Sequence, residues 1–547
     1  MNAEGSTAER DIVRKLARGS LLSRLKGSKQ PLKIAAVPRD HVQGDRQRGE
    51  ALLLGRVMSG SETFPLFEGE LNVVGKGADT IQGFSWLRDL AAAASREKGA
   101  PLAEAVVGRW LLAHGTKVDE AWAPEYWGER ILYWSAYAPY ILSSGDGGYR
   151  SALLNTLARG ARHLDSNAEK APAGLKRVTA WCGVIAAGLL VQGGVSRVAR
   201  GEAGLARAFA SAQFDDGGLI SRSPFEQALL VDRLALLRSC YFAAKQTIPD
   251  TLEAAAAAAL AALHGVTMGD GALSSWQGCG PGDAQRLTAL VEGCGLRARP
   301  LRQARGWGYQ RMSALGTIVV VDAAPPPSPK AAVLGCASTL AFELSDGAQR
   351  LVVNCGGTGP SPTQLSDDLL QALRSTAAHS TLVLEDTNST AILPDGSLGR
   401  GVEDVAVERS EDNDASRLTA DHSGYVRAFG LVHKRSLMLG NDGKELRGAD
   451  QLVAQGRKRI KEAAGYAVRF HLAPGVEATP TADGMGAILR SRGAPPWNFR
   501  CRGGMLTTEE SLWIDGRGQA VPTAQLVIVG EVSSLGGEVG WLFRRTS

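Results

Sequence analysis

The spacing of the apolar residues changes near residue 306, and this change constrains the fold more than any other feature of the sequence. Before it, as in 102–114 and 131–142, apolar residues recur every three or four positions, which is typical of helices. After it, short β-branched runs such as 317–322 and 350–354 are separated by turn residues, which is typical of an antiparallel sandwich. The sequence therefore predicts a helical domain and a β-sandwich domain, with a ligand-binding cleft between them.

The change of pattern also sets the expected boundaries. We place a helical domain of antiparallel helix pairs at residues 51–300 and the sandwich at residues 306–547. Residues 1–50 form a basic extension, in which 10–26 interleaves leucines with Lys and Arg. This segment fits either a solvated helix that caps the first domain or a helix in peripheral contact with a membrane surface. Residues 178–196 carry no charge, but four glycines favour a helix buried in the domain over a transmembrane span.

Composition and missing motifs exclude several classes of function. The 61 Lys and Arg against 56 Asp and Glu leave a net charge of +5 without a dense basic block, so no nucleic-acid partner is expected. The seven cysteines show no paired spacing for a disulfide framework or a zinc finger. Scattered free thiols and the lack of a secretory signal predict a cytoplasmic protein. Phosphate-binding and dinucleotide motifs are missing from the sequence, so we expect no cofactor.

Aromatic residues are densest between Trp122 and Tyr140, where seven of the chain's 32 aromatic residues fall. Rings of Trp and Tyr stack on sugars, while their polar edges form hydrogen bonds with hydroxyl groups. We expect Trp122 and Trp127, beside two glutamates, to form a wet rim that faces a ligand, and Tyr137 to stack on the same ligand. The alternative is that Tyr133, Tyr137 and Tyr140, at helical spacing, belong to the core.

Charged and imidazole side chains mark further candidate positions. Asp216 lies in a turn rich in Asp and Gly, and Arg222 follows at the N-terminal edge of the next helix. Arg374 lies just upstream of His379, which stands at the entry to an apolar strand. His471 alternates with apolar residues on a later strand. For both histidines, the alternative to a functional role is a hydrogen-bonded structural residue.

Several segments together resemble the heparinase II/III-like family of bacterial polysaccharide lyases. The resemblance rests on residues 335–344, 351–356, 374–382 and 470–474, and it extends more loosely to 216–224. It implies an incomplete α/α toroid followed by an antiparallel β-sandwich, which agrees with the change of pattern. It also implies β-elimination on an acidic, uronic-acid-containing polysaccharide or oligosaccharide.

Such a reaction needs a group that neutralises the uronate carboxylate, a base that removes the C5 proton and an acid for the leaving oxygen. On the resemblance, Arg222 and Arg374 would bind carboxylates, because a guanidinium donates two parallel hydrogen bonds to them. His379 would be the acid or base, with Tyr133 or Tyr309 as a phenolic partner. The other implied substrate contacts are Trp122, Trp127, Tyr137, Asp216 and His471.

Some positions depart from the family pattern. Residues 335–338 read Gly-Cys-Ala-Ser where metal-binding relatives carry a His-x-His-x-Asp-like run, so no metal is expected. Leu219 and Ser223 stand where the resemblance implies a His- or Asn-type residue, and Phe225 lacks the hydroxyl group that a catalytic Tyr would have. Two functions therefore remain: a lyase, or a catalytically degenerate scaffold that binds carbohydrate or associates with the cell envelope. Because lyases of this family are often exported, the envelope or periplasm is the alternative location.

Overall fold

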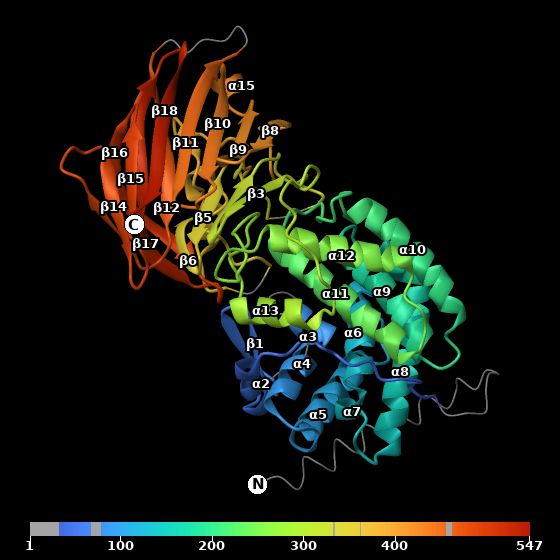
Figure 1. The fold of residues 1–547 in the computed structure, drawn as a ribbon. Helices are drawn as coiled ribbons and strands as arrows, with labels where there is room; N and C mark the ends of the chain where they lie inside the picture. Colours follow the sequence, from blue (N-terminus) through green and yellow to red (C-terminus); the bar gives the residue numbers. More distant parts are fainter. Residues whose placement is uncertain (1–31, 67–77, 332–333, 361–362, 456–461, 547) are drawn as a thin grey trace. The chain divides into compact units, whose positions relative to one another are not determined.

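The structure is a computed structural model that describes residues 32–66, 78–331, 334–360, 363–455 and 462–546 (Figure 1). The basic segment at 10–26 lies outside the described residues. The chain divides into two compact units. The first comprises Met1–Gln213, Leu229–Ala257 and Ala289–Arg297, and the second Phe214–Ala228, Ala258–Thr288 and Ala298–Ser547. Parts of the helical half of the sequence thus group with the sandwich.

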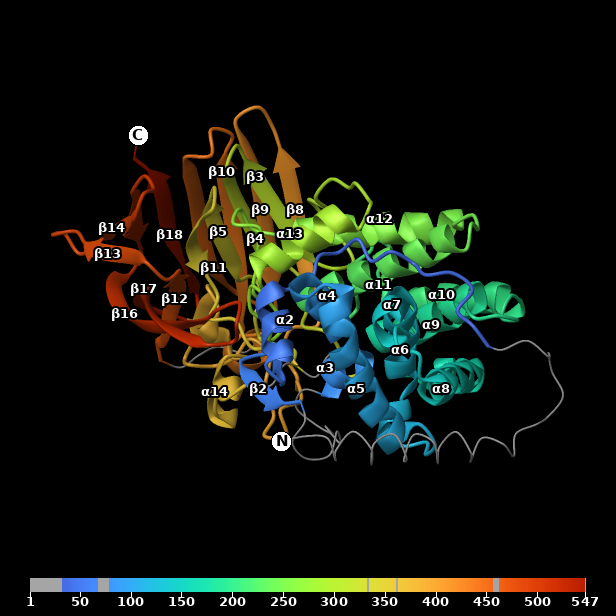
Figure 2. The same cartoon turned by 90° about the horizontal axis from the view of Figure 1, so that it is seen from below.

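The first unit is built from helices and one short hairpin. Its elements are α2 (Arg46–Leu53), β1 (Arg56–Ser59), β2 (Glu62–Pro65), α3 (Ala78–Gly83), α4 (Trp86–Ala93), α5 (Arg96–His114), α6 (Pro124–Ala136), α7 (Ala138–Ile141), α8 (Gly147–Asn167), α9 (Leu175–Leu190) and α10 (Ser196–Ala212). The unit boundaries fall within three further helices, α11 (Pro224–Ala243), α12 (Asp250–Gly265) and α13 (Ala284–Gly293). Figure 2 shows α8, α9 and α10 side by side.

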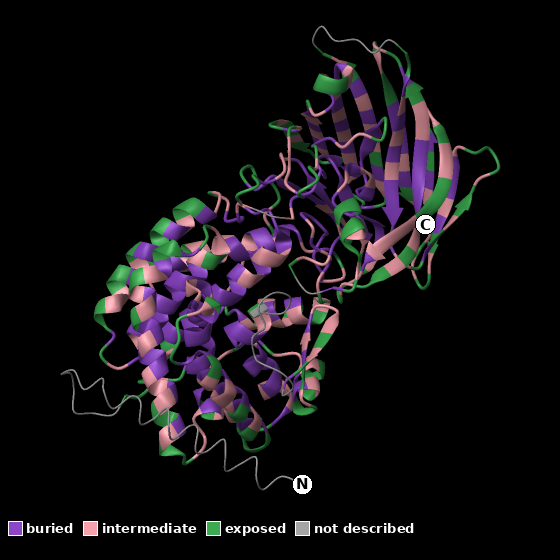
Figure 3. Ribbon diagram, turned by 180° about the vertical axis from the view of Figure 1, so that it is seen from behind, coloured by how far each residue is buried: buried purple, intermediate pink, exposed green. Residues whose placement is uncertain are grey.

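Helix α9 packs against α6, α8 and α10, and all but one of its residues from Val178 to Leu190 are buried. The buried helix predicted for the uncharged segment 178–196 is therefore confirmed up to Leu190, where the helix ends. Buried residues fill the interior of the helical unit (Figure 3). Glycines let α8 approach α6 closely and let α10 approach α9 closely. A Cβ atom on Gly160 of α8 would lie 2.2 Å from the ring of Trp127, and one on Gly204 of α10 would lie 2.4 Å from the ring of Trp181. In the described part of the chain, no helix is long and apolar enough to cross a membrane.

The second unit contains two large antiparallel sheets. One has the strand order β13-β14-β15-β18-β11-β10-β9-β8, and the other has the order β16-β17-β12-β6-β5-β4-β3, with β7 paired to β12. The strands are β3 (Tyr309–Ala314), β4 (Thr317–Asp322), β5 (Phe342–Asp346), β6 (Gln349–Val353), β7 (Leu382–Leu384), β8 (Val405–Glu411), β9 (Ala415–His422), β10 (Leu431–Gly440), β11 (Glu445–Ala454), β12 (Ala464–Leu472), β13 (Val476–Pro480), β14 (Gly486–Ser491), β15 (Trp497–Arg502), β16 (Met505–Ile514), β17 (Ala520–Val532) and β18 (Gly536–Arg545). Two short helices, α14 (Asp367–Ala372) and α15 (Val426–Phe429), lie in the connections.

One hydrophobic core joins the inner faces of the two sheets. The rings of Phe342 on β5 and Trp541 on β18 stack with their centroids 5.3 Å apart, and Phe470 on β12 lies 5.0 Å from Trp541. Strand β10 alternates buried and half-buried side chains along its whole length, as expected for a strand with one face in a core. The expected order of helices followed by an antiparallel sandwich is confirmed.

The close approach of α8 and α6 can be tested with a single methyl group. We expect Gly160→Ala to lower the free energy of unfolding by about 1–3 kcal/mol, because the added Cβ overlaps the buried Trp127 ring. Gly147→Ala, in the first turn of the same helix, is the control because its Cβ would have no neighbour within 4 Å. Urea denaturation of both variants measures the difference. Equal stability of the two variants would contradict the packing described.

Candidate functional site

The aromatic segment of the first unit is buried, so the expected ligand-facing rim is wrong. Trp122 is 3% exposed, Trp127 0%, Tyr133 1% and Tyr137 9%. The physical reason is that α6 packs directly against α9, which turns the aromatic face of α6 into the core. The alternative interpretation, core tyrosines at helical spacing, holds for Tyr133 and Tyr137, which stack with ring centroids 6.4 Å apart.

Aromatic rings of this unit surround the buried guanidinium of Arg130. The guanidinium carbon of Arg130 lies 4.0 Å from the centre of the Trp110 ring and 4.5 Å from that of Trp127. Its Nη2 donates hydrogen bonds to the carbonyl oxygens of Gln82 and Ala121. Burial lowers the pKa of Arg130 well below its usual value. Trp110, Trp127 and Trp134 thus pack around an internal guanidinium, so the position of these rings needs no sugar ligand to explain it.

A chain of alternating charges lies beside the aromatic residues. Arg88 contacts Asp40 through Nε at 2.7 Å and Asp232 through Nη2 at 2.7 Å. Arg233 contacts the other oxygen of Asp232 at 2.5 Å and also pairs with Glu129. Each buried charge of this network therefore has an opposite charge beside it within the first unit.

The two candidate tyrosines belong to this network. The hydroxyl of Tyr133 donates to Asp232 at 3.1 Å, and the hydroxyl of Tyr137 donates to Asp40 at 2.9 Å. Burial raises the pKa of both phenols above the ordinary value of 10. A phenol that removes a proton must first lose its own, so this environment opposes a role for Tyr133 as a base.

In the second unit, Arg222 is held by partners from its own unit and is only 2% exposed. Its Nη2 lies 2.5 Å from the carboxylate of Asp322, its Nε donates to the carbonyl oxygen of Trp307 at 2.8 Å, and its Nη1 donates to that of Pro325 at 2.6 Å. The guanidinium carbon lies 4.8 Å from the centre of the Tyr309 ring. Its backbone φ of 54° lies in the left-handed region, where a side chain is strained unless its surroundings fix it.

Tyr309 and Asp216 serve the same cluster. The hydroxyl of Tyr309 donates to the backbone oxygen of Arg222 at 2.6 Å, and burial raises its pKa well above the usual value. The carboxylate of Asp216 accepts hydrogen bonds from the backbone nitrogens of Gly306 and Trp307, both at 2.9 Å. The structure thus brings together Asp216, Arg222 and Tyr309, but in contacts that hold backbone segments.

Arg374 and His379 also contact the backbone. Nε of Arg374 donates to the carbonyl oxygen of Gly335 at 2.9 Å. Nδ1 of His379 donates to that of Ser375 at 2.7 Å, and burial lowers the pKa of this histidine to about 4. His379 is therefore neutral at pH 7 and is a weak proton acceptor there, because a general base is most effective when its pKa is near the working pH.

His471, on β12, is hydrogen-bonded through both ring nitrogens. Nε2 donates to the carbonyl oxygen of Ala377 at 2.9 Å, and Nδ1 lies 2.7 Å from the hydroxyl of Ser511. Burial lowers its pKa to about 3. The interpretation of both histidines as hydrogen-bonded structural residues agrees with these contacts.

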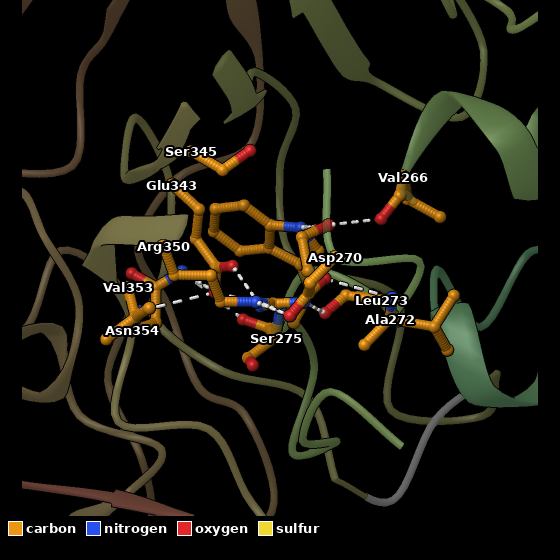
Figure 4. Close-up of polar contacts among 12 residues, drawn as sticks. Val266, Asp270, Ala272, Leu273, Ser275, Glu343, Ser345, Arg350, Val353 and Asn354 are labelled. Carbon is orange, nitrogen blue, oxygen red and sulfur yellow. Dashed lines mark hydrogen bonds and ion pairs between the residues drawn. The ribbon is translucent and has the colours of Figure 1, made fainter. Parts of the chain in front are cut away.

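Another charged cluster of the second unit fixes the loop that follows α12 (Figure 4). Arg350 on β6 forms two hydrogen bonds with Asp270, at 2.7 and 3.0 Å, and a third with Glu343 on β5 at 3.1 Å. Glu343 also accepts from the backbone nitrogen of Ser275 at 2.9 Å. Burial raises the pKa of Glu343, while Arg350 acts in the opposite direction. The cluster ties residues 270–275 to the sheet.

Sequence reasoning missed the acidic partners of these arginines. Asp322 ends the apolar strand β4, and a charge at the end of a buried strand was the available signal. Asp232 and Arg233 interrupt the apolar run of α11, which was a second signal. No pattern in the sequence linked either carboxylate to its guanidinium, since Arg222 and Asp322 are 100 residues apart. Among the described residues, no group of three His, Cys, Asp or Glu could hold a metal ion.

Comparisons with known proteins agree with this architecture. Residues 296–542 match the family model described as heparinase II/III-like, C-terminal. These residues form a heparinase II/III-like C-terminal domain. The solved structure of heparinase III covers 98% of this chain and 92% of its own, with a TM-score of 0.70 and 12% identity. A mutant of heparan sulfate lyase HepC from Pedobacter heparinus covers 99% and 89%, with a TM-score of 0.61 and 13% identity. These likenesses show a toroid-plus-sandwich fold.

A relative of known name extends over almost the whole chain. FtsZ-localized protein C from Caulobacter vibrioides (strain NA1000 / CB15N) is 26% identical over 94% of this chain and 90% of its own. The aligned part therefore includes residues from both units of this chain.

Removing Asp322 tests the buried ion pair of the second unit. We expect Asp322→Ala to lower the free energy of unfolding by about 3–5 kcal/mol, because the buried guanidinium of Arg222 loses its counter-ion. Glu50→Ala is the control, since its pair with Arg46 is exposed and such pairs contribute less than about 1 kcal/mol. Denaturant titration measures both variants. A loss for Asp322→Ala no larger than that of the control would show that Arg222 does not depend on this carboxylate.

The buried histidines predict how stability depends on pH. His379 has a pKa of about 4 when folded and about 6.5 when unfolded, so the unfolded chain binds more protons between these values. Its contribution is complete above about pH 6.5 and is lost as the pH falls through about 4, a change of about 3 kcal/mol. We expect His379→Gln to have a shallower pH dependence than wild type in denaturation between about pH 4 and 7.

The surface variant His41→Gln serves as the control for this experiment, because His41 is exposed. It should follow the wild-type curve. If His379→Gln kept the full wild-type dependence of stability on pH, the conclusion that His379 is buried and neutral would be wrong.

Proposed function

We propose that this protein is a non-catalytic scaffold of the lyase fold that localises with FtsZ. The observation that carries the proposal is the state of Arg222, whose three guanidinium nitrogens all have acceptors within its own unit. A lyase needs a group that neutralises the uronate carboxylate. Arg222, one of the two arginines expected in that role, instead contacts the carboxylate of Asp322. The structural match to lyases therefore supports the fold, while the contacts support a role without β-elimination.

The acid–base groups support the same conclusion. His379 and His471 have lowered pKa values, whereas Tyr133 and Tyr309 have raised ones, and burial is the main cause in all four. Efficient proton transfer at neutral pH needs groups whose pKa lies near 7. Burial moves each of these groups away from that value.

The relative supplies the cellular context. FtsZ-localized protein C aligns with 94% of this chain, which includes both the helical unit and the sandwich. A cytoplasmic location is part of the proposal, and the seven buried, unpaired cysteines agree with a reducing compartment. Binding of an acidic polysaccharide without cleavage is compatible with this role, and cleavage is the competing function.

Co-sedimentation with polymerised FtsZ tests the proposal directly. We expect the purified full-length chain to pellet with FtsZ filaments from the source organism and to stay in the supernatant without them. The same preparation, incubated with heparan sulfate, alginate or hyaluronan, should give no ultraviolet absorbance from an unsaturated uronate product. Turnover of any of these polymers, abolished by His379→Ala, would replace the scaffold by a lyase. If the chain did not pellet with FtsZ filaments, the proposed association with FtsZ would be wrong.

A further inference from the structure

The outer face of the sheet that contains β8, β9, β10, β11 and β18 carries an ordered row of arginines. Cross-strand partners share a face of a sheet, and the register aligns Gly486, Arg500, Leu542, Arg447, Met438, Arg417 and Ser410 across β14, β15, β18, β11, β10, β9 and β8. Arginine thus alternates with a non-polar residue across the central strands. The side chains of Arg500, Arg447 and Arg417 are 49%, 56% and 42% exposed. The face opposite is the buried core of the sandwich.

The adjacent row on the same face has small side chains. Gly540, Ala449, Ser436 and Thr419 are aligned from β18 to β9. Beyond them, Gln451, Lys434 and Asp421 form the next row. The side chains of this row are shorter than those of the two rows beside it, which leaves room next to the arginines for a chain that crosses the strands.

The guanidinium groups are spaced regularly. Neighbouring strands lie about 4.8 Å apart, so arginines on every second strand stand about 10 Å apart. A polypeptide in the polyproline II conformation rises about 3.1 Å per residue with three residues per turn, so every third side chain points the same way at intervals of about 9 Å. A segment with an acidic residue at every third position would therefore place one carboxylate opposite each arginine of the row.

The arginines are not locked into their present contacts. Arg500 pairs with Asp483 in a turn at 2.7 Å, and Arg417 and Arg447 pair with Asp412 and Glu445. Exposed pairs such as Arg500–Asp483 and Arg417–Asp412 contribute only about 0–1 kcal/mol, so incoming carboxylates can replace these acids. Glu445 is less exposed and also contacts Arg544, so an incoming carboxylate would share Arg447 with it. Bidentate guanidinium–carboxylate contacts then favour an anionic partner over a neutral one.

We propose that this face of the sandwich, the Arg500–Arg447–Arg417 row with the row of small residues beside it, is the docking surface for an acidic, extended polypeptide segment of a partner protein. The inference rests on the proposed scaffold function, for which it names the surface and the kind of segment that is bound. Leu542 and Met438 give the segment apolar contacts between the charges.

The experiment uses the full chain and two fluorescent peptides with the same composition. One repeats Glu-Pro-Pro five times, and the other has its five glutamates together, followed by ten prolines. We expect the periodic peptide to bind more tightly in fluorescence anisotropy. The triple variant Arg417→Ala, Arg447→Ala and Arg500→Ala should bind it about tenfold more weakly, which corresponds to about 1.4 kcal/mol.

A matched triple variant controls for net charge. Arg46→Ala, Arg96→Ala and Arg207→Ala removes three exposed arginines from helices of the first unit, and it should bind the periodic peptide like wild type. Equal losses in both triple variants, or equal binding of the two peptides, would overturn the docking surface. Tighter binding of hyaluronan than of the peptide, lost in the Arg417/Arg447/Arg500 variant, would assign the face to a polysaccharide and also overturn the proposal.

FtsZ co-sedimentation separates this inference from the function on which it rests. If wild type pellets with FtsZ and the Arg417/Arg447/Arg500 variant does not, both stand. If the variant pellets as wild type does, the docking surface is wrong and the scaffold function stands. If wild type binds the periodic peptide but not FtsZ, the surface stands and the FtsZ partner is wrong.

Discussion

A buried ion pair between Arg222 and Asp322 is the contact on which the functional interpretation depends. A guanidinium removed from water is stable only when its hydrogen bonds and its charge are satisfied. Asp322 supplies the charge, and the backbone oxygens of Trp307 and Pro325 accept the remaining hydrogen bonds. Ser338 donates to the second oxygen of Asp322 at 2.6 Å. With these partners internal, the pair stabilises the second unit, and each guanidinium nitrogen of Arg222 is bonded within the chain.

The same physical rule governs other buried charges in both units. Asp450, in the sandwich core, accepts hydrogen bonds from Arg435 at 2.7 and 3.0 Å and from Trp541 at 2.9 Å, and His433 lies 2.7 Å away. These donors hold the pKa of Asp450 well below its usual value. In the first unit, aromatic rings surround Arg130. These buried charges thus stabilise the fold through internal contacts. Exposed arginines remain on the outer face of one sheet.

Much of the fold could be predicted from the sequence, because apolar spacing reflects which face of an element is buried. The shift from helical to alternating spacing was interpreted correctly on this basis, and so was the part of the uncharged segment that ends with α9 at Leu190. Candidate residues such as Trp127 and Arg222 were recognised as unusual, but their exposure was misjudged. The identity of an aromatic or charged residue does not show whether it lines a cleft or lies in a core. Only its neighbours in the tertiary structure distinguish the two. The cleft between the two domains remains a prediction.

The sequence by itself determined the order of helices and strands, the family resemblance of the C-terminal half and the positions at which polar groups depart from the family pattern. Only the tertiary structure decided what the conspicuous side chains do. It paired Arg222 with a carboxylate 100 residues away, placed Trp127 against Arg130 and aligned three arginines from separate strands into one row. Local periodicity follows from backbone geometry, whereas these contacts arise from packing between distant segments, which leaves no regular spacing in the sequence.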